Sequence, residues 1–218
     1  MTVADLISTS TPPLQPEDSV EYGLGLMMEL RVRHLPVVSH EGRLLGLLSE
    51  EMLLDAESPA TTVDTLLGAE PVSIGHRVHV FDATKVMMDH DLTLVPVVDD
   101  ERRFRGIVRR HDMFERFARM LATQESGAIV ALEVEKRDLS LAKIIYVIEQ
   151  NDVKVLSLST EAHGDRVGVT IKLNVKEATR VRHLLEHNGY PVVAAFGEEE
   201  DAEDLLDRVQ EFMRYLEA

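Results

Sequence analysis

One pattern occurs twice in this chain: RHLPVVSHEGRLLGLLS at residues 33–49 and TLVPVVDDERRFRGIVR at residues 93–109. The offset of 60 positions extends outward without a gap, so that residues 1–58 align with residues 61–118. Pro36-Val37-Val38 falls on Pro96-Val97-Val98, and Gly46 falls on Gly106. A period of this length indicates one supersecondary unit used twice, with each copy covering the apolar face of the other.

Each copy predicts the same series of elements, in which an amphipathic helix precedes two short apolar strands and a closing helix. The expected helices span 19–30 and 78–89, the expected strands span 35–38, 44–48, 95–98 and 104–108, and the closing helices begin near Ser49 and Arg110. Asp18 is the expected N-cap of the first helix, with Glu21 as its capping-box partner. Gly23 and Gly25 inside that helix indicate a close contact with another helix, because glycine lowers helix stability.

The paired methionines of the two copies, Met27-Met28 and Met87-Met88, follow helical spacing. Methionine is flexible and fills irregular gaps between packed helices. We therefore expect both pairs in the core and do not interpret them as a soft-metal site.

A different pattern begins after residue 127. Strands are expected at 129–134, 153–158, 166–173 and 191–196, and helices at 141–149 and 175–187. The order βαββαβ is that of a ferredoxin-like domain. Residues 198–218 are acidic, and an apolar stripe over 202–216 predicts an amphipathic C-terminal helix. The expected domains are thus 1–58, 61–121, 128–197 and the helix at 198–218.

Composition narrows the classes of function. The 218 residues carry a formal net charge of −16, which disfavours binding to nucleic acid and to anionic membranes. The absence of cysteine excludes disulfides and thiolate chemistry. The N-terminus lacks the pattern of a signal peptide, and no apolar run reaches membrane-spanning length. We expect a cytoplasmic protein.

The repeats resemble cystathionine β-synthase (CBS) domains arranged as a tandem pair, on the motifs at residues 33–49 and 94–108. Residues 128–197 resemble an ACT domain, on topology and on the runs at 141–145 and 153–157. The combined order is similar to that of the acetoin-utilisation B protein family. The resemblance implies an α+β fold, a CBS-domain pair followed by a ferredoxin-like domain, and a regulatory role.

In CBS pairs that bind adenosine nucleotides, a Ser or Thr after the second strand contacts phosphate, and an Asp three residues later holds the ribose hydroxyls. The first copy has Ser49 but places Met52 at the Asp position, so its site is degenerate. The second copy has Asp112 but places Arg109 at the hydroxyl position. A guanidinium binds phosphate in a bidentate way, so Arg109 and Arg110 are candidate phosphate partners.

The resemblance implies further residues around the Asp112 site. The adenine slot would be lined by Ser73, Ile74 and the backbone near Thr93 and Val95, and the facing copy would add Arg33 and His34. AMP, ADP, ATP and S-adenosylmethionine are the candidate regulatory ligands, and no cofactor is required.

Two other functions remain open. If both clefts have lost binding, the protein is an oligomeric scaffold for a partner. The ACT-like segment also allows amino-acid sensing, but its loop at 136–140 lacks the glycine that lets backbone approach such a ligand. Under each reading we expect a homodimer or higher oligomer, with a regulated protein as a further partner.

No catalytic constellation is expected. His183 and His187 lie four apart on a predicted helix, a spacing that suits zinc, but no third ligand accompanies them and both fall off the apolar face. His76 and His79 at the start of another helix are likewise expected on the surface. The sequence predicts neither a metal site nor an enzyme.

Overall fold

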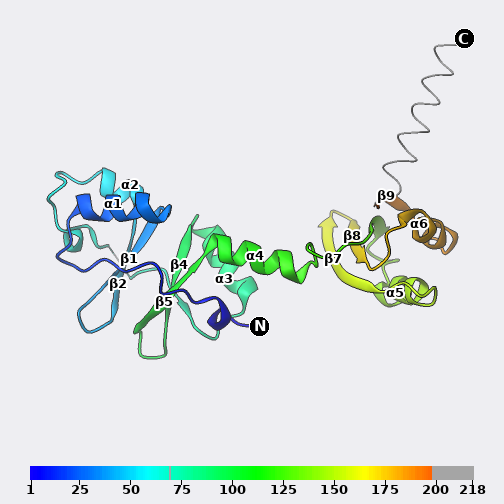
Figure 1. Ribbon diagram of the computed structural model, residues 1–218, viewed down its shortest axis with the longest axis horizontal. Helices are drawn as coiled ribbons and strands as arrows, with labels where there is room; N and C mark the ends of the chain where they lie inside the picture. Colours follow the sequence, from blue (N-terminus) through cyan, green and yellow to red (C-terminus); the bar gives the residue numbers. More distant parts are fainter. Residues whose placement is uncertain (69, 198–218) are drawn as a thin grey trace, which may run out of the picture. The chain divides into compact units, whose positions relative to one another are not determined.

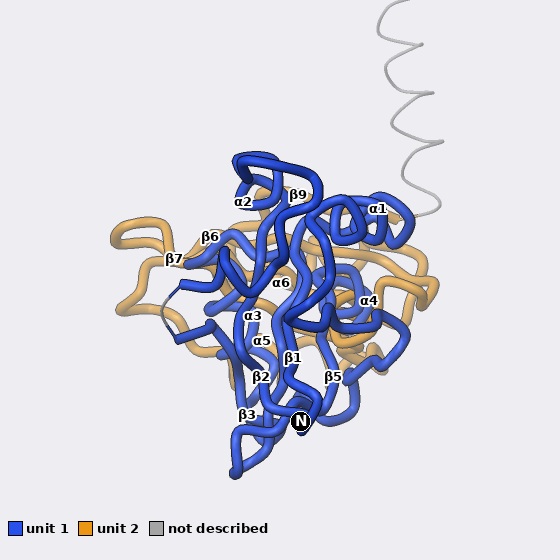
Figure 2. The backbone as a smooth tube through the Cα atoms, turned by 90° about the vertical axis from the view of Figure 1, so that its left-hand side faces the viewer, with its two compact units in different colours: residues 1–116 blue, residues 117–218 orange. Residues whose placement is uncertain are grey.

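A computed structural model describes residues 1–68 and 70–197 of the chain. The chain divides into two compact units, residues 1–116 and residues 117–218, which are coloured separately in Figure 2. Each is described by itself. The C-terminal helix expected at 202–216 lies outside the described residues.

The first unit contains the two repeats, and Figure 1 shows their helices and strands. The first repeat comprises α1 (Val20–Leu30), β1 (His34–Val38), β2 (Leu44–Ser49) and α2 (Glu50–Leu54), after the 3₁₀ turn η1 (Val3–Leu6). The second comprises β3 (Ile74–Gly75), α3 (Val80–Asp89), β4 (Leu94–Val98), β5 (Phe104–Arg109) and α4 (Arg110–Met120), after η2 (Val63–Leu66).

The internal symmetry extends to strand register. Val37 pairs with Gly46 in the antiparallel β1–β2 hairpin, and Val97 pairs with Gly106 in the β4–β5 hairpin. A register shift follows at the same step in both hairpins. The same apolar pattern therefore produces the same local fold twice.

The opening segments of the two repeats are exchanged. Ile7 packs against Gly106 of the second repeat, and its counterpart Leu67 packs against Gly46 of the first. Backbone hydrogen bonds agree, since the Val3 amide donates to the Val78 carbonyl and the Val63 amide donates to the Asp18 carbonyl. Leu94 and Ile107 share a core with the buried residues of the first repeat. The two repeats therefore form one folding unit.

Two sequence expectations for this unit need correction, and a third is confirmed. Ser19, and not Asp18, is the N-cap of α1, because its side chain accepts the Tyr22 amide. Gly23 does lie against another helix, since a Cβ there would come within 3.0 Å of Leu53. Gly25 faces open space, so helix packing does not explain it.

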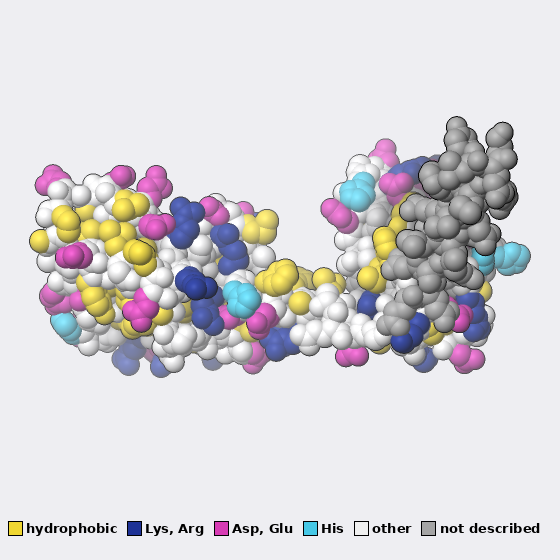
Figure 3. Space-filling view, turned by 45° about the horizontal axis from the view of Figure 1, so that its top comes forward, with side chains coloured by type: hydrophobic (Ala, Val, Ile, Leu, Met, Phe, Trp, Pro, Cys, Tyr) yellow, Lys and Arg dark blue, Asp and Glu magenta, His cyan; other side chains and the backbone are white. Residues whose placement is uncertain are grey.

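The prediction that both methionine pairs lie in the core is half wrong. Met27 and Met87 are buried, but Met28 and Met88 are 78% and 75% exposed. Adjacent residues on a helix differ by about 100° in direction, so a single apolar face cannot hold both members of a pair. Apolar side chains, yellow in Figure 3, accordingly reach the surface of the first unit.

The second unit is a ferredoxin-like βαββαβ domain. Its elements are β6 (Ile129–Glu135), α5 (Leu141–Glu149), β7 (Val155–His163), β8 (Arg166–Leu173), α6 (Ala178–His187) and β9 (Val192–Phe196). The sheet is antiparallel with the order β7-β8-β6-β9. Alternate residues of β6 and β8 are buried with Ile144 and Ile148 of α5 and Val181 and Leu185 of α6, so the core fills one face of the sheet.

In the part of the chain described, no helix has both the length and the apolar character needed to cross a membrane.

Candidate ligand site in the repeat pair

Asp112 and Arg109 form a closed ion pair where β5 ends and α4 begins. Arg109 Nε donates to Asp112 Oδ2 and Arg109 Nη2 donates to Asp112 Oδ1, both at 2.9 Å. The side chains are 18% exposed for Asp112 and 39% for Arg109. The hydrogen bond that the Arg109 guanidinium donates to Asp112 raises the pKa of Arg109. Both carboxylate oxygens of Asp112 therefore already have a cationic partner.

Arg110, the neighbouring candidate phosphate ligand, is held differently. Its Nε and Nη2 donate to the Leu92 carbonyl at 3.0 and 2.7 Å, and Nη2 also reaches Asp91 Oδ1 at 2.9 Å. The Arg110 amide donates to the Thr93 carbonyl. This side chain ties the start of α4 to the turn before β4.

His34 and Thr93 join the two repeats. The Thr93 amide donates to His34 Nδ1 at 3.3 Å, so this nitrogen is an acceptor and the ring proton resides on Nε2. Thr93 Oγ1 lies 2.9 Å from the same nitrogen and accepts the Arg33 amide at 3.2 Å. Burial lowers the pKa of His34, and the charges of Arg33 and Arg110 lower it further, while the charge of Asp91 opposes them. A neutral imidazole thus forms the link between β1 and β4.

The residues expected around an adenine lie along β3 and β4. Ile74 pairs with Val97, and Ile74 and Val95 are both buried in the apolar core. Ser73 and Thr93 are partly exposed. Leu94 pairs with Arg109, which places the Thr93 end of β4 beside the Arg109–Asp112 pair.

The equivalent place in the first repeat has other chemistry. Ser49 caps α2, its hydroxyl accepting the Met52 amide at 3.2 Å. Arg33 Nε pairs with Glu50 Oε2 at 3.2 Å. Met52 supplies no carboxylate at the position that Asp112 occupies in the second repeat.

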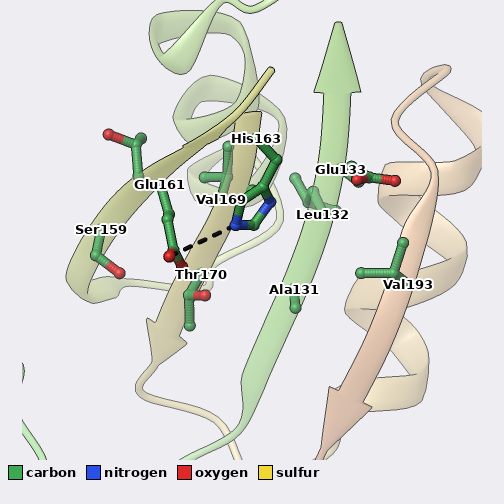
Figure 4. A pocket seen from close by; sticks show the side chains of 11 residues that line it. Ala131, Leu132, Glu133, Ser159, Glu161, His163, Val169, Thr170 and Val193 are labelled. Carbon is green, nitrogen blue, oxygen red and sulfur yellow. Dashed lines mark ion pairs between the residues drawn. The ribbon is translucent and has the colours of Figure 1, made fainter. Parts of the chain in front are cut away.

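A separate hollow lies on the second unit, on the sheet face opposite α5 and α6, and Figure 4 shows its lining. Its volume is about 650 Å³. His163 lies against Gly168, and His163 Nε2 pairs with Glu161 Oε1 at 3.5 Å. Sequence reasoning missed this hollow, because it depends on a register that places Glu161 opposite Gly168 and His163 opposite Arg166.

The histidines at i and i+4 on α6 are exposed, and His183 Nδ1 lies 3.8 Å from Glu186. Within residues 1–68 and 70–197, no group of three or more His, Asp or Glu side chains has a geometry that suits a metal ion.

The intertwined repeats, with matched hairpins and polar side chains where the second strand meets a helix, define a tandem-repeat module. The model of the CBS domain matches residues 3–58 and 63–119, and the chain belongs to this family. A solved CBS domain pair/ACT domain protein from Thermotoga maritima shares the fold, with 24% identity and a TM-score of 0.51 over 56% of this chain and 99% of that chain.

Curated relatives include two archaeal enzymes. The inosine-5'-monophosphate dehydrogenase of Korarchaeum cryptofilum is 28% identical over 212 residues, which cover 95% of this chain and 40% of the relative. That of Methanocaldococcus jannaschii is 24% identical over 94% of this chain and 39% of the relative. The chain thus spans about two fifths of these relatives.

Proposed function

We propose that this chain is a non-catalytic regulatory protein of the cytoplasm that binds an adenosine nucleotide between its two repeats. Asp112 holds the ribose hydroxyls, Arg109 meets the phosphate, and Ser73, Ile74 and the Thr93–Val95 backbone lie along the adenine. Arg33 and His34 contribute from the first repeat. The proposed domains are residues 1–58, 61–121 and 128–197, followed by the acidic segment 198–218.

One observation carries this proposal: a partly exposed carboxylate in the first turn of α4, three residues after a cation. A carboxylate accepts two hydroxyl hydrogen bonds, and a helix N-terminus favours an anion beside it. Asp112 lies in the second CBS domain, and this family membership supports a ligand-binding role for its carboxylate. Since the first repeat has Met52 at the matching position, we propose one site per chain.

We propose that the effect of a bound ligand reaches the second unit through α4. α4 carries Asp112 in its first turn, and the chain enters the second unit at Phe117, within the same helix. The Leu121 carbonyl just beyond α4 accepts a hydrogen bond from Ser157 Oγ of β7 at 2.8 Å. A ligand that binds one arrangement of α4 better than another shifts the population of both arrangements. We propose that this shift is read out through a homodimer or higher oligomer, or by a regulated protein.

A thermal-shift panel on the full chain tests the proposal, with AMP, ADP, ATP, S-adenosylmethionine and amino acids as probes. A ligand at a hundred times its dissociation constant stabilises the fold by about 2.7 kcal/mol. We expect a nucleotide shift that Asp112→Ala abolishes. Asp82→Ala is the matched control, because it removes a first-turn carboxylate from α3 and leaves α4 intact.

The closed Arg109–Asp112 pair also favours a second function, the oligomeric scaffold without a ligand. In that case no nucleotide shifts the melting temperature of the intact chain. A shift with amino acids that persists in Asp112→Ala would instead assign sensing to the ACT-like domain.

A further inference from the structure

We propose that the Arg109 guanidinium closes the ligand site by pairing with Asp112 and must move aside before a ligand binds; we call Arg109 a latch for this reason. The latch makes the site select phosphorylated adenosine ligands over unphosphorylated ones. This inference rests on the proposed function. It adds a ligand class and names the residue that sets it.

The ion pair and a bound ribose compete for the same atoms. Arg109 occupies both oxygens of Asp112 in a bidentate arrangement. The two hydroxyls of a ribose need those same oxygens. Because Asp112 is only 18% exposed while this pair is closed, its oxygens become open to a ligand only when the guanidinium moves aside.

Moving the guanidinium is unfavourable unless the ligand offers it a new partner. Breaking the pair takes the cationic partner from a carboxylate that is only 18% exposed, and it leaves the guanidinium without its anion. The hydroxyls of adenosine satisfy the carboxylate, but they leave the guanidinium without an anion. The phosphate of a nucleotide provides the bidentate anionic partner that suits arginine.

Neighbouring charges do not take over this role. Arg110 is anchored to the Leu92 carbonyl and Asp91. Arg33 is paired with Glu50. Arg109 is the cation that holds both oxygens of Asp112, so it is the one that exchanges this carboxylate for a ligand.

The ligands rank accordingly. AMP carries a dianionic group on its 5′ carbon, adenosine carries a neutral hydroxyl there, and S-adenosylmethionine carries a cationic sulfonium. Among these groups attached directly to the 5′ carbon, only the phosphate compensates the displaced guanidinium, because the carboxylate of S-adenosylmethionine lies several bonds farther out. The order of affinity expected for the intact chain is AMP or ADP first, and adenosine and S-adenosylmethionine well below.

Isothermal titration of the full chain with AMP and with adenosine tests the latch in the wild type, in Arg109→Ala and in Arg109→Gln. We expect the wild type to bind AMP on the order of tenfold or more tightly than adenosine, the scale of one charge-assisted hydrogen bond. In both variants adenosine should bind more tightly than in the wild type, because Asp112 is then free, and the preference for AMP should fall. Circular dichroism and melting curves of the three proteins verify the fold.

The outcomes separate the latch from the binding site itself. Equal affinity of the wild type for AMP and adenosine overturns the latch and leaves the proposed function intact. A variant that loses AMP but gains no affinity for adenosine also overturns it, since Arg109 is then a simple phosphate contact. If AMP and adenosine bind neither the wild type nor the variants, the proposed function fails together with the latch.

Discussion

Polar side chains gather at the start of β1, β4 and α4 in the first unit. Arg33, His34 and Thr93 are connected by hydrogen bonds across the two repeats, and Arg109 lies opposite Leu94 in the adjoining hairpin. The repeat would place a leucine at position 34, as it does at Leu94. The imidazole at this position therefore replaces an apolar contact with a polar link that depends on its protonation state.

Acidification should weaken the fold through His34. Its pKa in the folded state is lowered from 6.5, chiefly by burial, so the unfolded chain takes up a proton first as the pH falls. The stability that the neutral His34 contributes is complete above pH 6.5. It is lost as the pH falls from 6.5 toward the lower pKa of His34 in the folded state.

Urea unfolding of the wild type and of His34→Leu over this range measures the effect. The variant should lose less stability on acidification, and the other histidines cancel in the difference. Parallel pH profiles for the two proteins would contradict the assignment.

The strands β2 and β5 each contain a glycine against which the opening segment of the other repeat packs. Gly106 in β5 has a φ of +138°, and a Cβ there would lie 2.6 Å from Ile7 and 2.7 Å from the Ser8 carbonyl. Gly46 holds the same position against Leu67. A side chain at either glycine separates an opening segment from the partner repeat.

Gly106→Ala should destabilise the chain by about 2 kcal/mol or more, since it combines backbone strain with a collision against backbone. Gly42→Ala is the control, because Gly42 has a φ of +80° but open space around it and reports strain alone. Denaturant titration of both variants gives the comparison. A Gly106→Ala protein no less stable than Gly42→Ala would argue against the exchange of segments.

Gly25→Ala should raise the free energy of unfolding by about 1 kcal/mol. Gly25 lies in the interior of α1 with nothing near its missing Cβ, so alanine gains helix propensity without a clash. A loss of stability on thermal unfolding would show that this surface is covered in the protein.

The sequence predicts most of these elements, because apolar spacing and the 60-residue repeat reflect local physics. The strand register follows from the matched motifs, and α5 begins and ends where expected. The Arg109–Asp112 pair was not anticipated, although an i,i+3 arginine and aspartate at a helix start permits it. The exposure of Met28 and Met88 and the hollow beside His163 were missed because they depend on which faces pack together.

The whole molecule consists of two units, a CBS-domain pair and a ferredoxin-like domain, and the boundary between residues 116 and 117 falls within α4. The chain belongs to the CBS family, and its curated enzyme relatives are more than twice its length. The proposed regulatory role therefore concerns this chain of 218 residues and not the dehydrogenase activity of the longer relatives. Assembly and partner binding are its proposed outputs.

Isothermal titration of the full chain with AMP, in the wild type, Asp112→Ala and Asp82→Ala, tests the binding site most directly. We predict one AMP per chain in the wild type and in Asp82→Ala, and no binding in Asp112→Ala. Absence of binding in the wild type, or undiminished affinity in Asp112→Ala, would contradict the assignment of a ribose-binding carboxylate to α4.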